Sequence, residues 1–257
     1  MIKKHIPNLF TLLNLLSGMI AVLMAVTDQL LAATLFVFLG IFFDFFDGFF
    51  ARKFKVEGEL GKQLDSLADM VTSGVVPGIV MFQMMLFATK GKWFMELSGI
   101  TDSWQEYQEI FYYFIPFTGL LITLAAAYRL ANFNIDERQT SSFIGLPTPA
   151  MSIFVLSFPL ILFYSDNLFF IGLLQNIYVL IGITILGSYL MNAEIPLFAL
   201  KFKNYSWKGN EVQYVFLLLT MGLLISLKTV AIPLTIILYI VLSIFDNWTK
   251  KKDSTIS

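Results

Sequence analysis

The sequence predicts an all-α, polytopic integral membrane helix bundle with about eight transmembrane helices. Of the 257 residues, 57% are hydrophobic and only 14% are charged, whereas a soluble domain carries about 25% charged residues. Apolar runs of membrane-spanning length recur along the chain, and the basic residues fall mainly on one side of them. These observations exclude an ordinary soluble domain.

The apolar runs are close to the length of about 17–25 residues that a transmembrane helix needs. They cover residues 8–26, 31–51, 64–87, 112–132, 147–164, 168–191, 212–227 and 229–247. Only Lys228 and its neighbours separate the last two runs, so a single kinked segment is the alternative there. Residues 88–111 form one long outer connection, which we expect to lie along the membrane interface as a short amphipathic piece.

The basic residues indicate how the helices are oriented. If the connections alternate from a cytoplasmic N-terminus, 14 of the 17 Lys and Arg residues fall inside, and only Lys90, Lys92 and Lys228 fall outside. Cytoplasmic connections are enriched in Lys and Arg. We therefore expect a multi-pass protein of the cell (inner) membrane with both termini in the cytoplasm.

A polar stripe runs along the first apolar segment. Asn8, Thr11, Asn14 and Gly18 lie within about 120° of one another on a helical wheel. Two lysines before an apolar run are also typical of a signal peptide, but a cleaved segment has no use for such a stripe. The stripe can form hydrogen bonds inside the bundle, with a ligand or only between helices.

The chain reads as a single transmembrane domain over residues 1–257, because no internal repeat or low-complexity tract divides it. Its motif core is the segment 44–69, and residues 201–257 add further C-terminal helices. There is no Cys, and the one histidine is His5. This excludes disulfides, thiolate chemistry, a histidine metal site and a Ser-His-Asp triad, and leaves acid–base work to Asp, Glu, Lys, Tyr or water.

Four aspartates within 26 residues stand out in this apolar chain. A carboxylate near the membrane core costs about 2.5–3.5 kcal/mol on insertion scales, so four together indicate a function. Because a helix turns by about 100° per residue, Asp44 and Asp47 lie one turn apart on one face, and Asp65 and Asp69 share a face of the next helix. Two pairs of carboxylates on consecutive helices can bind divalent cations through hard oxygen ligands.

Small and basic residues accompany the aspartates. Gly48 and Ala51 lie on the face of Asp44 and Asp47 and leave room for a bulky group against the backbone, and Arg52 borders that face. Further along, Arg129 ends an apolar helix on the cytoplasmic side. It is either a snorkelling arginine or an anion-binding group turned towards the aspartates.

At these residues the sequence resembles the CDP-alcohol phosphatidyltransferase family. The family signature is D-x2-D-G-x2-A-R-x8-G-x3-D-x3-D. All eight positions are present here, as Asp44, Asp47, Gly48, Ala51, Arg52, Gly61, Asp65 and Asp69. The resemblance implies an enzyme with its active site at the cytoplasmic end of the bundle, open sideways to the bilayer. There a cytidine-diphosphate lipid would bind, and CMP would leave when an alcohol attacks the lipid-side phosphorus.

The resemblance also implies a role for each site residue. Asp44, Asp47 and Asp65 would hold Mg²⁺ or Mn²⁺, and Asp69 would lie near a second ion and act as the general base. The residues expected around the cytidine diphosphate are Asn8, Thr11, Gly48, Ala51, Arg52, Gly61 and Lys62. The residues expected at the acceptor alcohol or a phosphate are Asn14, Ser66 and Arg129.

Flanking stretches are similar to the phosphatidylserine synthase branch of the family. They are residues 7–14, 64–69, 73–77, 129–134 and 143–150, and the similarity covers roughly residues 3–200. This branch implies CDP-diacylglycerol and L-serine as substrates, phosphatidylserine and CMP as products, and a homodimer in the lipid bilayer. Glycerol 3-phosphate or inositol phosphate is the alternative acceptor within the family.

A cation transporter is the alternative from another class, because carboxylates within membranes are common on ion pathways. The four aspartates, however, cluster at one membrane face, and the middle parts of the later apolar runs carry no charge that would continue a path. The sequence offers no sign of a nucleic-acid partner.

Overall fold

The computed structural model describes residues 5–91, 114–135, 143–198, 206–207 and 209–256, with side chains as far as residue 249. Most of the expected outer connection at 88–111 lies outside these residues. The same is true of several basic residues in the predicted cytoplasmic connections, among them Lys3, Lys4, Arg138, Lys201, Lys203 and Lys208.

The first part of the chain forms three long helical passes. They are α1 (Ile6–Val26), α2 (Leu30–Phe54), and a third pass made of α3 (Glu59–Asp69), the π-helical turn η2 (Met70–Val75) and α4 (Val76–Lys90). Proline stands in the first turn of α1, where its missing N–H is not needed, and Pro77 directly follows the π-helical turn inside the third pass. The helix α2 ends at Lys55, whose left-handed backbone (φ 55°) lets the chain turn into α3.

The later part of the chain consists of shorter helices and a two-residue strand pair. In order they are η4 (Ile115–Leu120), α7 (Leu121–Ile135), β1 (Phe143–Ile144), α8 (Thr148–Tyr164), α9 (Leu168–Leu174), α10 (Ile177–Asn192), β2 (Pro196–Leu197), α11 (Glu211–Leu227), η6 (Lys228–Val230) and α12 (Ala231–Ile256). The strands β1 and β2 pair antiparallel, with Phe143 opposite Leu197.

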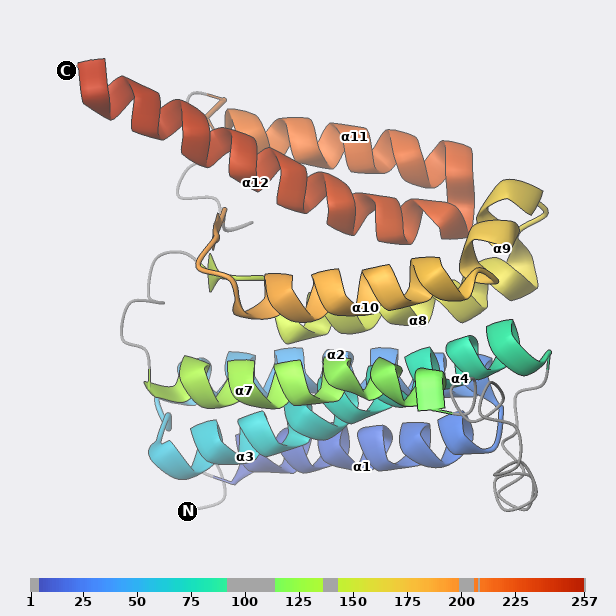
Figure 1. The fold of residues 1–257 in the computed structure, drawn as a ribbon. Helices are drawn as coiled ribbons and strands as arrows, with labels where there is room; N and C mark the ends of the chain where they lie inside the picture. Colours follow the sequence, from blue (N-terminus) through green and yellow to red (C-terminus); the bar gives the residue numbers. More distant parts are fainter. Residues whose placement is uncertain (1–4, 92–113, 136–142, 199–205, 208, 257) are drawn as a thin grey trace.

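The long helices run side by side in stacked layers, and successive passes alternate in direction (Figure 1). The α2–α3 turn, the last turn of α7 and the β1–β2 pair all lie at the end of the bundle that also carries the N-terminus. At the opposite end the chain reverses at Lys228, which has a positive φ of 49°. The helices α11 and α12 therefore lie against each other, and the single kinked segment considered for residues 212–247 is not formed.

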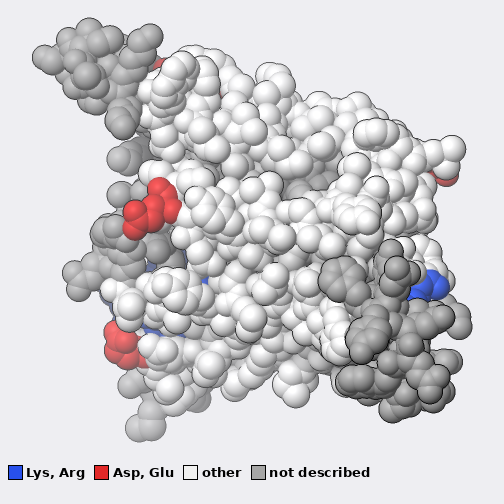
Figure 2. Space-filling model, in the orientation of Figure 1, with Lys and Arg blue, Asp and Glu red and all other residues white. Residues whose placement is uncertain are grey.

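Membrane-spanning character is clear in the described part of the chain. Four stretches are long and apolar enough to cross a membrane, namely Ile6–Val26, Leu30–Phe54, Glu59–Lys90 and Glu211–Thr249, the last of which contains both α11 and α12 with the reversal at Lys228. The pair α9 and α10 passes the same test as one broken span bent by 72°, and α8 is apolar but shorter. Figure 2 shows a broad uncharged belt, with the charged side chains of the visible face near its two ends. The predicted polytopic helix bundle is confirmed, whereas the count of eight is not, because several later helices are short or bent.

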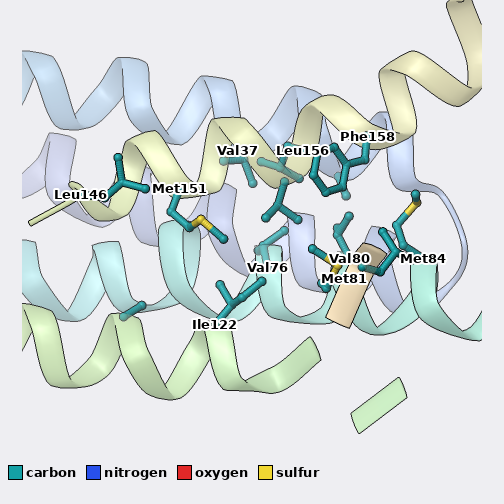
Figure 3. Close-up of a cluster of buried hydrophobic side chains, with 14 of the residues drawn as sticks. Val37, Val76, Val80, Met81, Met84, Ile122, Leu146, Met151, Leu156 and Phe158 are labelled. Atoms are coloured by element: carbon teal, nitrogen blue, oxygen red, sulfur yellow. The ribbon is translucent and has the colours of Figure 1, made fainter. Parts of the chain in front are cut away.

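The apolar core lies between α2, α4, α7 and α8 (Figure 3). Val37, Val80, Met84, Ile122 and Leu156 contribute fully buried side chains to it. Glycines bring the backbones still closer at its edge. A Cβ atom on Gly119 would lie 2.7 Å from the backbone nitrogen of Phe82, so only glycine permits this approach of η4 to α4.

This close approach predicts the effect of adding one methyl group. Gly119→Ala should lower the free energy of unfolding by about 1–3 kcal/mol, because overpacking against a backbone cannot relax easily. The measurement is the midpoint of thermal unfolding in detergent. Gly182→Ala in α10 is the matched control, since a Cβ atom there meets nothing within 4 Å. Equal midpoints for the two variants would contradict the assigned packing.

Candidate active site

The aspartates of the signature converge where α2 faces α3. Asp44 and Asp47 lie in the second half of α2, and Asp65 and Asp69 lie one turn apart at the end of α3. One carboxylate oxygen each from Asp44, Asp47 and Asp65 lies within 4.8 Å of the other two. Helical spacing within each helix and the approach of the two helices thus bring three carboxylates to a single point.

The three carboxylates fit a hard divalent cation. Negative charges this close repel each other strongly outside bulk water, and a cation between them removes that repulsion. Within the described residues, the Oδ1 atom of Asp65 is buried and has no hydrogen-bond partner, so this oxygen is available as a ligand. An all-oxygen donor set of this kind suits Mg²⁺ or Mn²⁺.

The polar stripe of α1 faces the aspartates. The Thr11 hydroxyl lies 2.7 Å from Oδ2 of Asp47 and donates a hydrogen bond to it. One turn further along, the side-chain amide of Asn14 donates to Oδ1 of Asp69 over 3.2 Å. Both side chains are buried. The helix α1 therefore supplies hydrogen-bond donors to one aspartate of each pair.

A cavity of about 630 Å³ opens between the ends of α1, α2 and α3. It is lined by all seven residues that the sequence predicted for the cytidine diphosphate: Asn8, Thr11, Gly48, Ala51, Arg52, Gly61 and Lys62. Asp47 and Asp65 form part of its wall. A Cβ atom on Gly48 would come within 3.3 Å of the Arg52 guanidinium, so the glycine lets this cation lie across the helix face.

A second cavity, of about 470 Å³, lies between the same aspartates and the helices α7 and α8. Asp44 and Asp69 line this cavity, together with Arg129 and Thr148. Asp47, Gly48, Arg52, Asp65 and Phe133 line both cavities. The carboxylates therefore stand between two spaces, each large enough for a small ligand.

The structure assigns Arg129 a contact that sequence reasoning did not foresee. Its side chain is only 7% exposed, so it does not snorkel to solvent. Its Nη1 atom donates hydrogen bonds to the carbonyl oxygens of Ile144, at 2.8 Å, and Met191, at 2.6 Å. Arg129 thereby joins α7 to β1 and to the end of α10 while also lining the second cavity.

Ser66 and Lys62 both contact the end of α7. The Ser66 hydroxyl and the Asn134 side-chain amide are hydrogen bonded at 2.8 Å, and Nζ of Lys62 donates to the Asn134 carbonyl at 2.6 Å. Ser66 does not line either of the two cavities. Its hydroxyl instead bonds across to α7, and its place at the acceptor stays a prediction.

Comparison with known proteins decides the family. The profile of the CDP-alcohol phosphatidyltransferase family matches residues 4–188. The chain belongs to the CDP-alcohol phosphatidyltransferase family. The match includes the four signature aspartates and both cavities, and it ends before α11 and α12.

Three curated relatives show which members of the family the chain is similar to. The chain is 31% identical over 161 residues to the CDP-diacylglycerol–serine O-phosphatidyltransferase of Bacillus subtilis, covering 60% of this chain and 76% of the relative. It is 29% identical over 164 residues to the archaetidylserine synthase of Methanothermobacter thermautotrophicus, a match that covers 63% of this chain and 60% of the relative. It is 28% identical over 152 residues to a CDP-diacylglycerol–serine O-phosphatidyltransferase of Helicobacter pylori, a match that covers 58% of this chain and 55% of the relative.

One residue of this phosphatidyltransferase site escaped sequence reasoning. Thr72, in the π-helical turn directly after Asp69, is fully buried and bonded to Asn14. It stands three residues beyond the last signature position, in an apolar run where a lone threonine is usually a helix-packing residue. Only the position of α1 against η2 reveals that Thr72 bonds to the side chain that in turn bonds to Asp69.

The carboxylate cluster predicts how metal binding responds to mutation. Asp65→Asn should weaken Mn²⁺ binding at least about 10-fold, because the change removes a charged ligand and even outer-shell partners contribute about 10–100-fold. Titration followed by electron paramagnetic resonance measures the affinity. Asp166→Asn, which changes an exposed carboxylate between α8 and α9, is the control and should bind Mn²⁺ as the wild type does. An unchanged affinity for Asp65→Asn would remove this residue from the metal site.

Proposed function

We propose that this chain transfers the phosphatidyl group of CDP-diacylglycerol to the hydroxyl of L-serine and releases phosphatidylserine and CMP. The observation that carries the proposal is the complete family signature with three carboxylates within 4.8 Å of one another, standing between two cavities. A transferase with two substrates needs such a layout. The relatives named for serine transfer, at 28–31% identity, support serine as the acceptor.

The cytidine-diphosphate end of the lipid suits the first cavity. Its wall combines the Arg52 guanidinium with the small residues Gly48, Ala51 and Gly61. A guanidinium binds phosphate oxygens in a bidentate manner, and small residues let the nucleotide approach the helix backbone. Asn8 adds a side-chain amide from α1.

The carboxylates would hold the metal that this family requires. We propose Mg²⁺ or Mn²⁺, with one ion held by Asp44, Asp47 and Asp65 and a second near Asp69. Bound there, such ions neutralise the diphosphate and stabilise the charge that moves to the leaving group during transfer.

Asp69 is the proposed general base. Its carboxylate lines the second cavity, where the acceptor would lie. The serine hydroxyl oxygen forms a new bond to the lipid-side phosphorus, and the bond from that phosphorus to the bridging oxygen breaks. CMP leaves with the bridging oxygen, and the hydroxyl proton passes to Asp69. A carboxylate positioned within hydrogen-bond reach can accept a proton in this way.

The membrane placement is part of the proposal. The described basic residues Arg52, Lys53 and Lys55 lie in the last turn of α2 and its cap, beside the aspartates, as the positive-inside tendency would place them on the cytoplasmic side. We therefore propose an inner-membrane protein with both termini in the cytoplasm and the active site at that face. A homodimer is proposed from the family resemblance, and the mass of the detergent-solubilised protein tests it.

The acceptor is tested with a panel of alcohols. Purified protein with CDP-diacylglycerol and Mn²⁺ should convert labelled L-serine to phosphatidylserine, with CMP released in equal amount. Glycerol 3-phosphate and inositol phosphate, assayed in parallel, should give at most a small fraction of that rate. A higher rate with either of them would overturn serine as the acceptor but not the family chemistry.

The base is tested with one conservative substitution. Asp69→Asn should lower kcat by at least about 100-fold, because a general base contributes about 10²–10⁴-fold, while CDP-diacylglycerol still binds. Product formation and lipid binding are measured on the same preparation, beside wild type and Asp166→Asn. Near wild-type turnover in Asp69→Asn would exclude Asp69 as the base.

A further inference from the structure

We infer that Thr72 is a positioning residue for the reaction, acting through Asn14 on the carboxylate of Asp69. The inference rests on the proposed function, in which Asp69 accepts the proton of the acceptor hydroxyl. It adds two buried side chains, from η2 and α1, that set how this carboxylate is held.

The three side chains form a continuous hydrogen-bonded row. The Thr72 hydroxyl lies 2.8 Å from Oδ1 of Asn14, and Nδ2 of Asn14 lies 3.2 Å from Oδ1 of Asp69. Thr72 and Asn14 are both completely buried, with 0% exposure. Solvent therefore cannot replace the Thr72–Asn14 bond when one partner is removed, whereas the Asn14–Asp69 bond is part-buried and ends at a carboxylate that lines the second cavity.

The chemistry of the row gives it a direction. An amide has one oxygen that accepts and one nitrogen that donates, whereas an ionised carboxylate only accepts. With the Thr72 hydroxyl donating to Oδ1, the N–H groups of Asn14 point at Asp69. The reversed amide would place its oxygen against the carboxylate, where two acceptors repel each other. Thr72 thus holds the amide in the orientation that binds the base.

The Thr72 hydroxyl has a choice of acceptors, and the amide is the nearest. Its oxygen lies 3.0 Å from the carbonyl of Ala68 and 3.3 Å from the carbonyl of Asn14, against 2.8 Å to Oδ1. One hydroxyl proton can serve only one of these acceptors at a time. The carbonyl of Ala68 lies on the same helical pass, so it is the partner expected of a threonine without any role in the site.

Two glycines make room for the row. A Cβ atom on Gly18 would lie 2.5 Å from the Thr72 hydroxyl oxygen, and one on Gly40 would lie 2.8 Å from Oδ1 of Asn14. Glycines also occur in transmembrane helices simply to bring backbones together. Here a Cβ on Gly18 would meet the Thr72 hydroxyl first, and one on Gly40 would meet both the Thr72 methyl, at 2.7 Å, and Oδ1 of Asn14, so α1 and α2 leave space for this contact.

The local backbone agrees with a functional placement. The chain changes from α-helix to π-helix at Met70, the residue that follows Asp69, and Thr72 lies within that turn. Such turns are rare and occur frequently at functional sites. Thr72 and Asp69 thus flank the change of helix type, and both bond to Asn14.

The experiment compares three variants with wild type. Thr72→Val removes the hydroxyl and keeps the shape, Thr72→Ser keeps the hydroxyl, and Thr184→Val is the matched control. Thr184 is also fully buried, and among the described residues its hydroxyl bonds to the Leu180 carbonyl within α10. We expect kcat for phosphatidylserine formation to fall about 10-fold or more in Thr72→Val. This is the lower end of the loss of about 10–100-fold that follows mutation of residues supporting a directly acting group. The KM values for serine and CDP-diacylglycerol should stay within about twofold, because the base acts in the transfer step and not in binding.

Two further comparisons separate positioning from folding. Thr72→Ser should recover most of the lost kcat, and Thr184→Val should retain wild-type kcat although it loses an equally buried hydroxyl. The inference is overturned if Thr72→Val keeps wild-type kcat, if its loss appears in KM alone, or if Thr72→Ser does not recover turnover.

A measurement without turnover tests the row directly. In protein labelled with ¹⁵N-asparagine, the side-chain NH₂ signals of Asn14 are identified by their absence in Asn14→Leu. They should shift in Thr72→Val and in Asp69→Asn but not in Thr184→Val. Signals that do not move in Thr72→Val would overturn the inference. If the wild type forms no phosphatidylserine but the Asn14 signals still shift in Thr72→Val and Asp69→Asn, the proposed function is overturned and the hydrogen-bonded row is supported.

Discussion

The mutual repulsion of clustered carboxylates in an apolar bundle is the constraint on which this structure depends. Two unit charges about 5 Å apart repel each other by about 3 kcal/mol at an effective dielectric constant of about 20, and Asp44, Asp47 and Asp65 are at least that close. Favourable partners must therefore surround them. The helix α1 contributes donors from Thr11 and Asn14, and the geometry leaves the remaining compensation to a divalent cation.

The same constraint divides the site into two halves. A cation between α2 and α3 requires both helices to present carboxylate oxygens at one point. A cavity lies on each side of this point. One side is closed by α1 and carries Lys62, the other is closed by α7 and α8 and carries Arg129, and Arg52 lines both. In the proposed function, this arrangement separates the nucleotide from the acceptor and gives both access to the same carboxylates.

The motif core could be predicted from the sequence because its geometry is local. Spacings of three and four residues place Asp44 with Asp47 and Asp65 with Asp69 on any regular helix, and the stripe of α1 follows the same rule. The contacts of Arg129 could not be predicted, because its acceptor on Met191 lies 62 residues away. The bond of Ser66 could not be predicted either, because its partner Asn134 belongs to another helix. The number of spans stayed uncertain because hydropathy does not report a 72° bend.

The strand pair β1–β2 has a consequence for the order in which the chain can assemble. Tyr239 of α12 donates to the carbonyl of Phe198, and Asn247 of α12 donates to the carbonyl of Pro196 in β2. The strand β2 pairs with β1, and Arg129 at the second cavity donates a hydrogen bond to the carbonyl of Ile144 in β1. During synthesis the carboxylate cluster is complete once the first three passes are inserted. The wall that carries Arg129 gains its last supports only when the final helix emerges.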